Sequence, residues 1–269
     1  IECEVTTTEK AGDGTVLARD SAAQGADAVI AGGGDGTINE VVNGLAGTGV
    51  LVGILPVGTV NVLARELGIP IDVRKAVKVI AEGQVRNIDL GCANGRHFTL
   101  MAGFGFDAEI VANVLQPLKD MIGSSAYVIK TIEAFARYDA THVELEMPTS
   151  CYSTEAFLII AANVSTYTYN LKMAPYAHPD DGLLDIVIFE KPVSDRIGFV
   201  RQVAEVFVRR HIYHHSVRYF RAKRVTVRSE PEILVQLDGD SFGTTPVEIS
   251  IDQRILPIIV PADAKARTV

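Results

Sequence analysis

The chain has 269 residues, of which 48% are hydrophobic and 22% charged, a composition typical of a globular protein with a sizeable core. Its net charge of −8 gives no global indication of nucleic-acid binding. Three distant cysteines lack metal-ligand spacing and predict buried thiols in a reducing compartment. With no apolar run approaching ~18 residues and no recognisable signal peptide, we expect a cytoplasmic protein.

The first third of the chain alternates between strand and helix signals. Strands are predicted over 28–31 and 50–55, and helices over 16–23, 38–45, 60–67 and 73–82. Residues 1–5 also alternate like a strand, and because the chain does not begin with methionine we expect an N-terminal piece to be missing. Strand-helix alternation with short loops predicts a doubly wound α/β domain.

After residue 85 the pattern changes to strands separated by turn residues. We expect strands over 86–91, 97–102, 142–147, 156–163, 184–189, 224–229, 233–237 and 247–251. Two helices interrupt them, over about 108–138 and 195–210. This part of the chain predicts an antiparallel β domain with inserted helices, and 255–260 could return to the first domain.

A glycine-rich turn follows the strand predicted over 28–31. Four glycines surround one acid, Asp35, and the backbone there can approach a ligand closely because glycine has no Cβ. Thr37 and Glu40 form a capping-box pattern that predicts a helix beginning at Ile38. A helix N-terminus suits phosphate, and an acid beside phosphate requires a divalent cation between them. The segment therefore predicts metal-assisted phosphate chemistry.

Two other phosphate loops do not match this segment. A P-loop requires Lys and then Ser or Thr after its last glycine, whereas Gly36 is followed by Thr37 and Ile38. The dinucleotide fingerprint requires a third glycine or alanine where this chain has Thr37. A tight turn that binds nothing is the remaining alternative, but it does not need four glycines.

A second strand-turn-helix unit repeats the arrangement. Gly58 would open its turn and Thr59 would cap its helix. In a parallel sheet, ligands lie beyond the carboxyl ends of the strands, where two such turns can face each other. The two Gly-Thr turns together favour one shared phosphate site.

Acids beside glycines recur in the β region. Asp107 follows two glycines and could simply be a helix N-cap. Three acids lie within 178–185, where either a cation site or a solvated turn is possible. Asp238 and Asp240 flank Gly239 in a hairpin-like turn. The stretch 196–228 has nine Arg or Lys residues against Glu205, and could meet anionic headgroups or be a solvated surface.

Taken in order, these segments resemble the diacylglycerol kinase catalytic-domain family, which includes bacterial soluble diacylglycerol and lipid kinases and the sphingosine kinases. The first motif alone would also admit NAD kinases and phosphofructokinases, but the ordered set is specific. The motifs that carry the resemblance are Gly33-Gly-Asp-Gly-Thr-Ile-Asn-Glu40, Leu55-Pro-Val-Gly-Thr-Val-Asn61, Gly103-Phe-Gly-Phe-Asp-Ala108, Asp181-Gly-Leu-Leu-Asp185 and Asp238-Gly-Asp240.

The resemblance implies an α/β nucleotide-binding domain over 1–87, N-terminally incomplete, and a β-sandwich domain for the lipid substrate over 88–254, with 255–269 possibly returning to the first domain. It also implies ATP and Mg²⁺ as cofactors and a lipid at a membrane surface as partner. The implied nucleotide-binding residues are Thr8, Gly33, Gly34, Asp35, Gly36, Thr37, Ile38, Asn39, Gly58, Thr59 and Asn61.

The same resemblance implies catalytic roles for two acids. Asp240 falls where the family places its proton-accepting carboxylate, and Asp35 would act through Mg²⁺ beside the phosphates. A structural Mg²⁺ would be held by the Asp181 carboxylate and the carbonyls of His178 and Leu183. The implied reaction is transfer of the ATP γ-phosphate to a lipid hydroxyl, with diacylglycerol as acceptor.

This chain departs from the family pattern in three places. The opening strand and its Asn-Pro-x-x-Gly turn are absent, Val62 replaces a frequent acid, and Asp240 is one methylene shorter than the usual glutamate. The shared Gly-Gly-Asp-Gly-Thr turn leaves a second class of kinase open, and the three departures leave open a class without catalysis. The protein could be a kinase of a soluble substrate such as NAD, or a nucleotide-binding regulatory module without catalysis. A peripheral membrane adaptor that uses the basic stretch is a third possibility.

Overall fold

The computed structural model describes residues 2–111, 138–168, 171–191, 205–206 and 208–262. Its helical elements are α1 Asp13–Ala23, α2 Asp35–Leu45, α3 Val62–Glu66, α4 Val73–Glu82, α5 Phe106–Ile110 and the 3₁₀ helix η2 His211–Tyr213. Its strands are β1 Ala28–Gly33, β2 Leu51–Pro56, β3 Gln84–Ala93, β4 Arg96–Phe98, β5 Met101–Gly105, β6 Thr141–Met147, β7 Ser150–Ala162, β8 Thr166–Thr168, β9 Leu171–Lys172, β10 Leu184–Glu190, β11 Val217–Ala222, β12 Arg224–Glu230, β13 Leu234–Leu237, β14 Asp240–Thr244 and β15 Val247–Val260.

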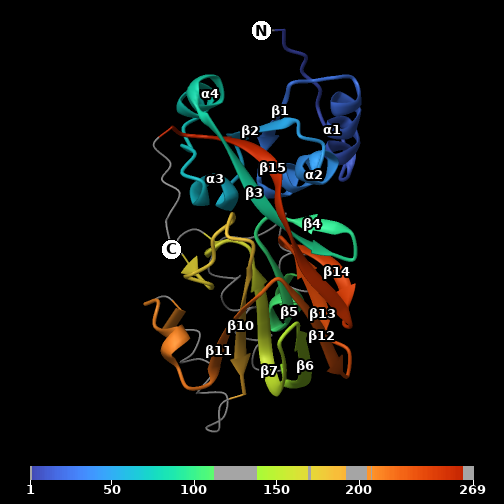
Figure 1. Cartoon of the computed structure of the whole chain (residues 1–269), viewed down its shortest axis with the longest axis vertical. Coiled ribbons are helices and arrows are strands. Elements are labelled where there is room, and N and C mark those ends of the chain that lie inside the picture. The colour runs from blue at the N-terminus through green and yellow to red at the C-terminus, as the bar shows by residue number, and fades with distance from the viewer. Residues whose placement is uncertain (1, 112–137, 169–170, 192–204, 207, 263–269) are drawn as a thin grey trace, which may run out of the picture.

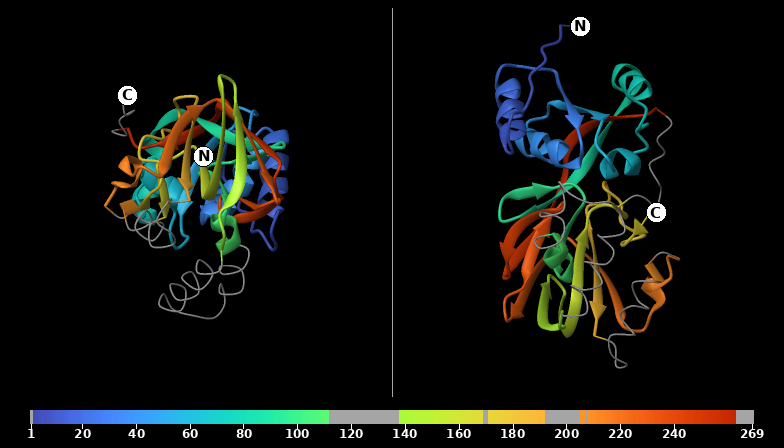
Figure 2. Two further views of the ribbon diagram at one scale, coloured as in Figure 1. Left: turned by 90° about the horizontal axis from the view of Figure 1, so that it is seen from below. Right: turned by 180° about the vertical axis from the view of Figure 1, so that it is seen from behind.

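The fold has an α/β half and an antiparallel β half stacked along the long axis (Figure 1). In the α/β half, β1 and β2 are parallel, and β2 also pairs in parallel with the end of β15. Helices α1 and α2 lie on one side of these strands and α4 on the other (Figure 2). The predicted fold class, a doubly wound α/β domain followed by an antiparallel β domain, is confirmed.

Two long strands join the halves. Antiparallel pairing of β3 with β15 extends from the Ala93–Ile249 pair to the Gln84–Val260 pair, so one ladder crosses from the β half into the α/β half (Figures 1 and 2). The register shifts between Asp252 and Leu256, which produces a bulge in β15. The boundaries expected at 87/88 and 254/255 thus fall inside paired strands, and the division into domains stays a prediction.

The β half encloses its own core between two layers of strands. Strand β7 contacts β5, β6 and β10. Its side chains contribute to two buried clusters. Ile159 and Ala161 belong to the core of the β half, whereas Ile160 and Ala162 belong to the cluster that continues into the α/β half. Alternating burial on a single strand therefore links the two cores.

The capping-box prediction was wrong. Helix α2 begins at Asp35, three residues before the expected start, because Gly34 is extended and takes the N-cap position. The Glu40 carboxylate accepts hydrogen bonds from the N–H groups of Gly12 and Gly14, at 2.8 and 2.9 Å, instead of capping its own helix. Glu40 therefore fixes the start of α1 against α2.

Several other expectations differ from the structure or concern residues that it does not describe. The described residues before α1, 2–9, are exposed coil and not a strand, since no neighbouring strand pairs with them. The strand expected over 97–102 divides into β4 and β5. Of the three free cysteines, Cys3 and Cys151 are exposed and only Cys92 is partly buried. The helix expected over 108–138 is described only to residue 111, and most of 195–210 lies outside the described residues.

Candidate nucleotide and catalytic site

The two glycine turns meet at the carboxyl ends of β1 and β2. Gly33 pairs with Pro56 in the strand register, and the Val57 N–H donates to the Gly33 carbonyl at 3.2 Å. Gly58 approaches so closely that a Cβ there would lie 2.4 Å from the Gly34 Cα. A side chain at position 58 would therefore not fit between the turns, which explains the glycine there.

The Asp35 carboxylate is directed at the second turn. Its two oxygens accept the N–H groups of Val62 and Leu63, at 3.0 and 3.2 Å, so Asp35 at the start of α2 caps α3. Each oxygen keeps a further lone pair, which leaves the carboxylate able to hold a cation as well. The structure thus gives Asp35 a structural role that its sequence position did not reveal.

The backbone of the first turn borders open space. A Cβ built at Gly32 or at Gly36 would meet no atom within 4 Å, and both glycines are exposed. The first N–H groups of α2 have no partner within the helix, and the positive end of its dipole lies here. The exposed Thr59 follows Gly58 in the second turn. These features fit a phosphate group.

Three of the predicted nucleotide-binding residues are engaged in contacts of their own. Asn61 closes the second turn, where its amide exchanges hydrogen bonds with the N–H and carbonyl of Gly58, at 3.0 and 2.7 Å. The Thr37 side chain occupies the space beside Gly33, and Ile38 is buried in the core. Thr8 lies in the exposed coil before α1, and its contact with the nucleotide stays a prediction.

Asn39 connects helix α2 to the acid turn of the β half. It is 6% exposed, and its Nδ2 donates to Asp238 Oδ2 at 2.8 Å. The Asp238 carboxylate also accepts the N–H groups of Thr99, Leu100 and Met101, at 2.7 to 2.9 Å. Burial raises the pKa of Asp238, while these donated hydrogen bonds lower it. Asp238 thus holds the 238–240 turn against both halves.

The predicted proton acceptor, Asp240, remains open to solvent. It begins β14, where its side chain is 51% exposed and lies 3.2 Å from Arg96 Nη2. Ion pairs this exposed contribute little to stability. Asp238, Asn39 and α2 connect Asp240 to the start of α2, where Asp35 lies. An exposed acid beside a cation, on a turn fixed to the phosphate side, is a suitable acceptor for a substrate proton.

The acidic turn 178–185 is held mainly by arginines. Asp181 Oδ2 pairs with Arg221, and its Oδ1 accepts the Leu183 N–H at 3.0 Å. Asp180 pairs with Arg86 at 2.7 Å. The buried Asp185 accepts a hydrogen bond from Tyr219 through Oδ1, but its Oδ2 has no donor.

The sequence analysis missed Asp89, which organises this region. Asp89 is fully buried in β3, and its carboxylate accepts the N–H groups of Gly182 and Arg254, at 2.6 and 2.7 Å. Its own N–H donates to the Pro179 carbonyl. Burial raises the pKa of Asp89, and the two N–H donors lower it. An acid between the apolar residues Ile88 and Leu90 of a predicted strand was the available signal.

The N-cap interpretation of Asp107 was also wrong. Gly105 takes the N-cap position of α5, and Asp107 lies in the first turn, 5% exposed. Its carboxylate accepts hydrogen bonds from Tyr167 at 2.5 Å and Gln236 at 2.6 Å. Burial raises the pKa of Asp107, and these two donors lower it.

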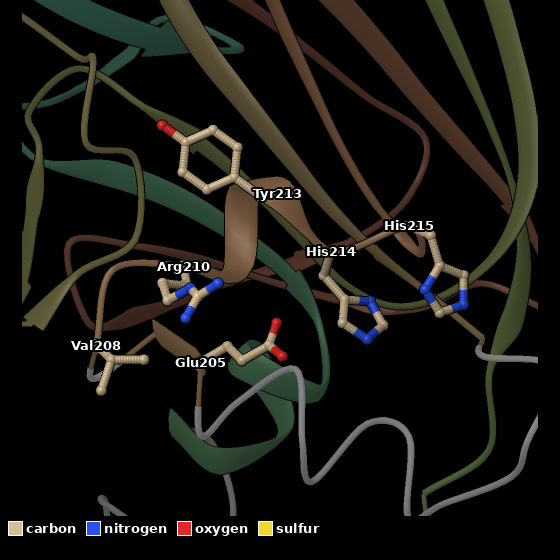
Figure 3. Close-up of a pocket in the computed structure, with 6 residues that line it drawn as sticks. All are labelled: Glu205, Val208, Arg210, Tyr213, His214 and His215. Carbon is tan, nitrogen blue, oxygen red and sulfur yellow. The ribbon is translucent and has the colours of Figure 1, made fainter.

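Part of the basic stretch is neutralised within the protein. Arg218 pairs with Glu190 at 3.3 Å, and Arg221 pairs with the acidic turn. A cavity of about 430 Å³ lies beside η2. Figure 3 shows the Glu205 carboxylate lying in this cavity between Arg210 and His214. The cavity is lined by Glu205, Val208, Arg210, Tyr213, His214 and His215.

Comparison with known proteins agrees with this geometry. Residues 1–93 match the model of the diacylglycerol kinase catalytic domain, and residues 101–260 match the YegS C-terminal NAD kinase beta sandwich-like domain. A Bacillus subtilis (strain 168) diacylglycerol kinase is 35% identical over 256 residues, covering 94% of this chain and 84% of the relative. The chain belongs to the diacylglycerol kinase family.

Other relatives of this diacylglycerol kinase family member span similar lengths. A diacylglycerol kinase of Staphylococcus saprophyticus is 33% identical, covering 96% of this chain and 85% of the relative. A crystal structure of a candidate diacylglycerol kinase from Bacillus anthracis str. Sterne superposes with a TM-score of 0.82 at 28% identity, covering 96% of this chain and 84% of that one. The protein is therefore a kinase of the lipid kinase family, which uses ATP as phosphate donor. Among the described helices, none is both long and apolar enough to cross a membrane.

Proposed function

We propose that this kinase transfers the γ-phosphate of ATP to the hydroxyl of diacylglycerol at a membrane surface. The observation that carries the proposal is the Asn39–Asp238 contact, at 2.8 Å, which joins the helix after the glycine turn to the turn bearing Asp240. Phosphoryl transfer depends mainly on positioning and on neutralising charge. The Asn39–Asp238 hydrogen bond links the proposed phosphate turn to the turn that carries Asp240, and so supports positioning of the two reacting groups.

In this proposed reaction the residues of the two turns have distinct roles. The first-turn N–H groups of α2 and the open space at Gly32 and Gly36 receive phosphates. Mg²⁺ beside Asp35 would neutralise phosphate charge. Asp240 accepts the hydroxyl proton, directly or through one water, and Arg96 lies 3.2 Å from its carboxylate.

The Asp181 region is proposed as the place of a second, structural Mg²⁺. Four carboxylates, of Asp89, Asp180, Asp181 and Asp185, face only two guanidinium groups there, and Asp185 Oδ2 is buried without a donor. An ion at Asp181 with the carbonyls of His178 and Leu183 would compete with Arg221. We expect Mg²⁺ to raise the unfolding temperature of the wild type but not of D181N.

The catalytic assignment is tested with D240N. Removing the proton acceptor should reduce turnover on dispersed diacylglycerol by at least about 100-fold, because general-base catalysis contributes about 10²–10⁴-fold. ATP affinity, measured by calorimetry, should remain unchanged. E232Q, an exposed acid in the same half, is the control. Unchanged turnover in D240N would refute the role of Asp240.

The nucleotide site is tested with G36A. Nothing in the protein opposes a methyl group there, and Gly-to-Ala inside a helix stabilises by up to about 1 kcal/mol. The same methyl would occupy space assigned to phosphate, so a folded protein with weakened ATP binding is expected. Retained ATP affinity would place the phosphates elsewhere. Activity on NAD without lipid would instead favour a kinase of a soluble substrate.

A further inference from the structure

A thiol, an imidazole and a carboxylate lie together on three adjacent strands. Cys92 on β3 is paired directly with His97 on β4, and on its other side with Ser250 on β15. Asp252 lies two residues beyond Ser250, so both point to the same side of the strand. The strand register itself therefore brings Cys92, His97 and Asp252 onto one face.

The distances suit a shared ligand. One donor atom from each side chain lies within 4.8 Å of the other two, and His97 Nε2 is 2.9 Å from Asp252 Oδ2. Ligands around a tetrahedral Zn²⁺ are separated by about 3.4–3.6 Å, given metal–ligand distances of about 2.0–2.3 Å. Small side-chain rotations would produce that spacing. Among the described residues, no other group of three His, Cys, Asp or Glu ligand atoms is this close.

The backbone beneath His97 is fixed by a second element. The His97 N–H donates to Asn43 Oδ1, and Asn43 Nδ2 donates to the His97 carbonyl, both at 2.9 Å. Strand β4 is thus held by β3 on one side and by α2 on the other. A ligand whose backbone is restrained in this way is well placed for metal binding.

We propose that Cys92, His97 and Asp252 form a binding site for a divalent transition metal, with Zn²⁺ as the best-fitting class. Thiolate, imidazole and carboxylate are all zinc ligands, and three protein ligands leave a fourth position for water. Mg²⁺ is a poor candidate, because it takes hard oxygen ligands. The imidazole is 18% exposed and the Asp252 carboxylate 43% exposed, so solvent reaches the site.

The ion would join β15 to the β3–β4 hairpin. Arg96, the ion-pair partner of Asp240, immediately precedes His97 on β4. The proposal does not depend on kinase activity, since it concerns a different face of this hairpin and is measured by metal binding. Failure of the proposed kinase function would leave it intact.

The test uses Co²⁺ as a spectroscopic probe in the full chain. The exposed thiols are first removed as C3S/C151S, which leaves Cys92 as the sole cysteine. Binding of one equivalent of Co²⁺ should produce a thiolate-to-cobalt charge-transfer band that Zn²⁺ abolishes. The band should be absent in the C92S derivative. No band in the parent, or a band that persists without Cys92, would overturn the proposal.

Variants that keep the thiol provide the second measurement. D252N and H97Q should weaken Co²⁺ binding by at least about tenfold, as loss of metal-site residues does. E248Q is the matched control, because Glu248 is an exposed acid on the same face of β15. Zn²⁺ should raise the unfolding temperature of the parent and of E248Q but not of D252N. Equal metal responses in D252N and E248Q would contradict the site.

Discussion

Asn39 Nδ2 lies 2.8 Å from Asp238 Oδ2, although 199 residues separate the two in the chain. This contact joins α2, which begins at the glycine turn, to the turn that carries the proposed proton acceptor. The remaining donors to Asp238 all come from residues 99–101. Asn39 is therefore the side chain through which the α/β half contacts this turn.

Replacing Asn39 with alanine should lower both stability and turnover. A hydrogen bond to a charged group contributes about 1.5–3 kcal/mol, so the unfolding free energy should fall by that order. Turnover should fall while the KM for ATP changes little, because the phosphate turns are untouched. Denaturant unfolding and steady-state kinetics measure the two effects. N87A, an exposed asparagine on β3, is the control. Equal turnover in N39A and N87A would show that the Asn39–Asp238 contact does not contribute to catalysis.

Asp35 and Asp72 offer a matched pair for separating capping from chemistry. Asp72 caps α4 by accepting the Lys75 N–H at 2.9 Å, as Asp35 caps α3. Alanine at either position should cost about 0.5–2 kcal/mol of unfolding free energy. Only D35A should also abolish turnover, since of these two acids only Asp35 lies in the proposed phosphate-binding turn. Equal activity losses in the two variants would show that capping alone explains Asp35.

Asp89 is expected to be critical for folding. An asparagine there can accept the Gly182 or the Arg254 N–H through its one oxygen, but its amide nitrogen cannot accept the other. A buried N–H left without a partner costs about 1–3 kcal/mol, which should appear in denaturant unfolding of D89N. E248Q, which changes an exposed acid on β15, is the control for folding. A wild-type unfolding free energy in D89N would contradict this account.

Asp107 should make stability depend on pH. Folding raises its pKa above the ordinary value of 3.8, so the folded state binds this proton more tightly than the unfolded chain. Its contribution to stability is therefore fully present below pH 3.8 and is lost as pH rises through the raised pKa. D107N removes this titration. The unfolding free energy of the wild type relative to D107N should thus rise as pH falls from about 8 to about 4. A constant difference would contradict the raised pKa.

Local patterns in the sequence predicted most of the secondary structure. The helix over 73–82 matches α4 at both ends, because its Asp72 cap and Gly83 stop are local signals. The start of α2 was misplaced because Glu40 caps a different helix, a tertiary contact that a capping-box pattern cannot anticipate. In the same way, spacing around Gly239 identified the acid turn but not the different environments of its two acids.

Side-chain roles at the site were harder to predict than the positions of the turns. The glycine at position 58 follows from the close approach of two backbones, which the two Gly-Thr turns in the sequence indicate. That Asp35 caps α3 and Asn61 closes its own turn depends on where the second turn lies in space. Asp89 was missed because its hydrogen-bond partners come from distant parts of the chain.

The shared β3–β15 ladder limits how the two halves can move. The two strands that pass between the halves, β3 and β15, are hydrogen-bonded to each other. Neither half can therefore rotate independently, as it could on a single flexible linker. Any change in the angle between the two halves must bend the paired β3 and β15 strands. We expect this bending at the β15 bulge, where the Asp89 carboxylate accepts the Arg254 N–H. Relative motion of the two halves would therefore bend the paired strands and would not be a free rotation about a flexible linker.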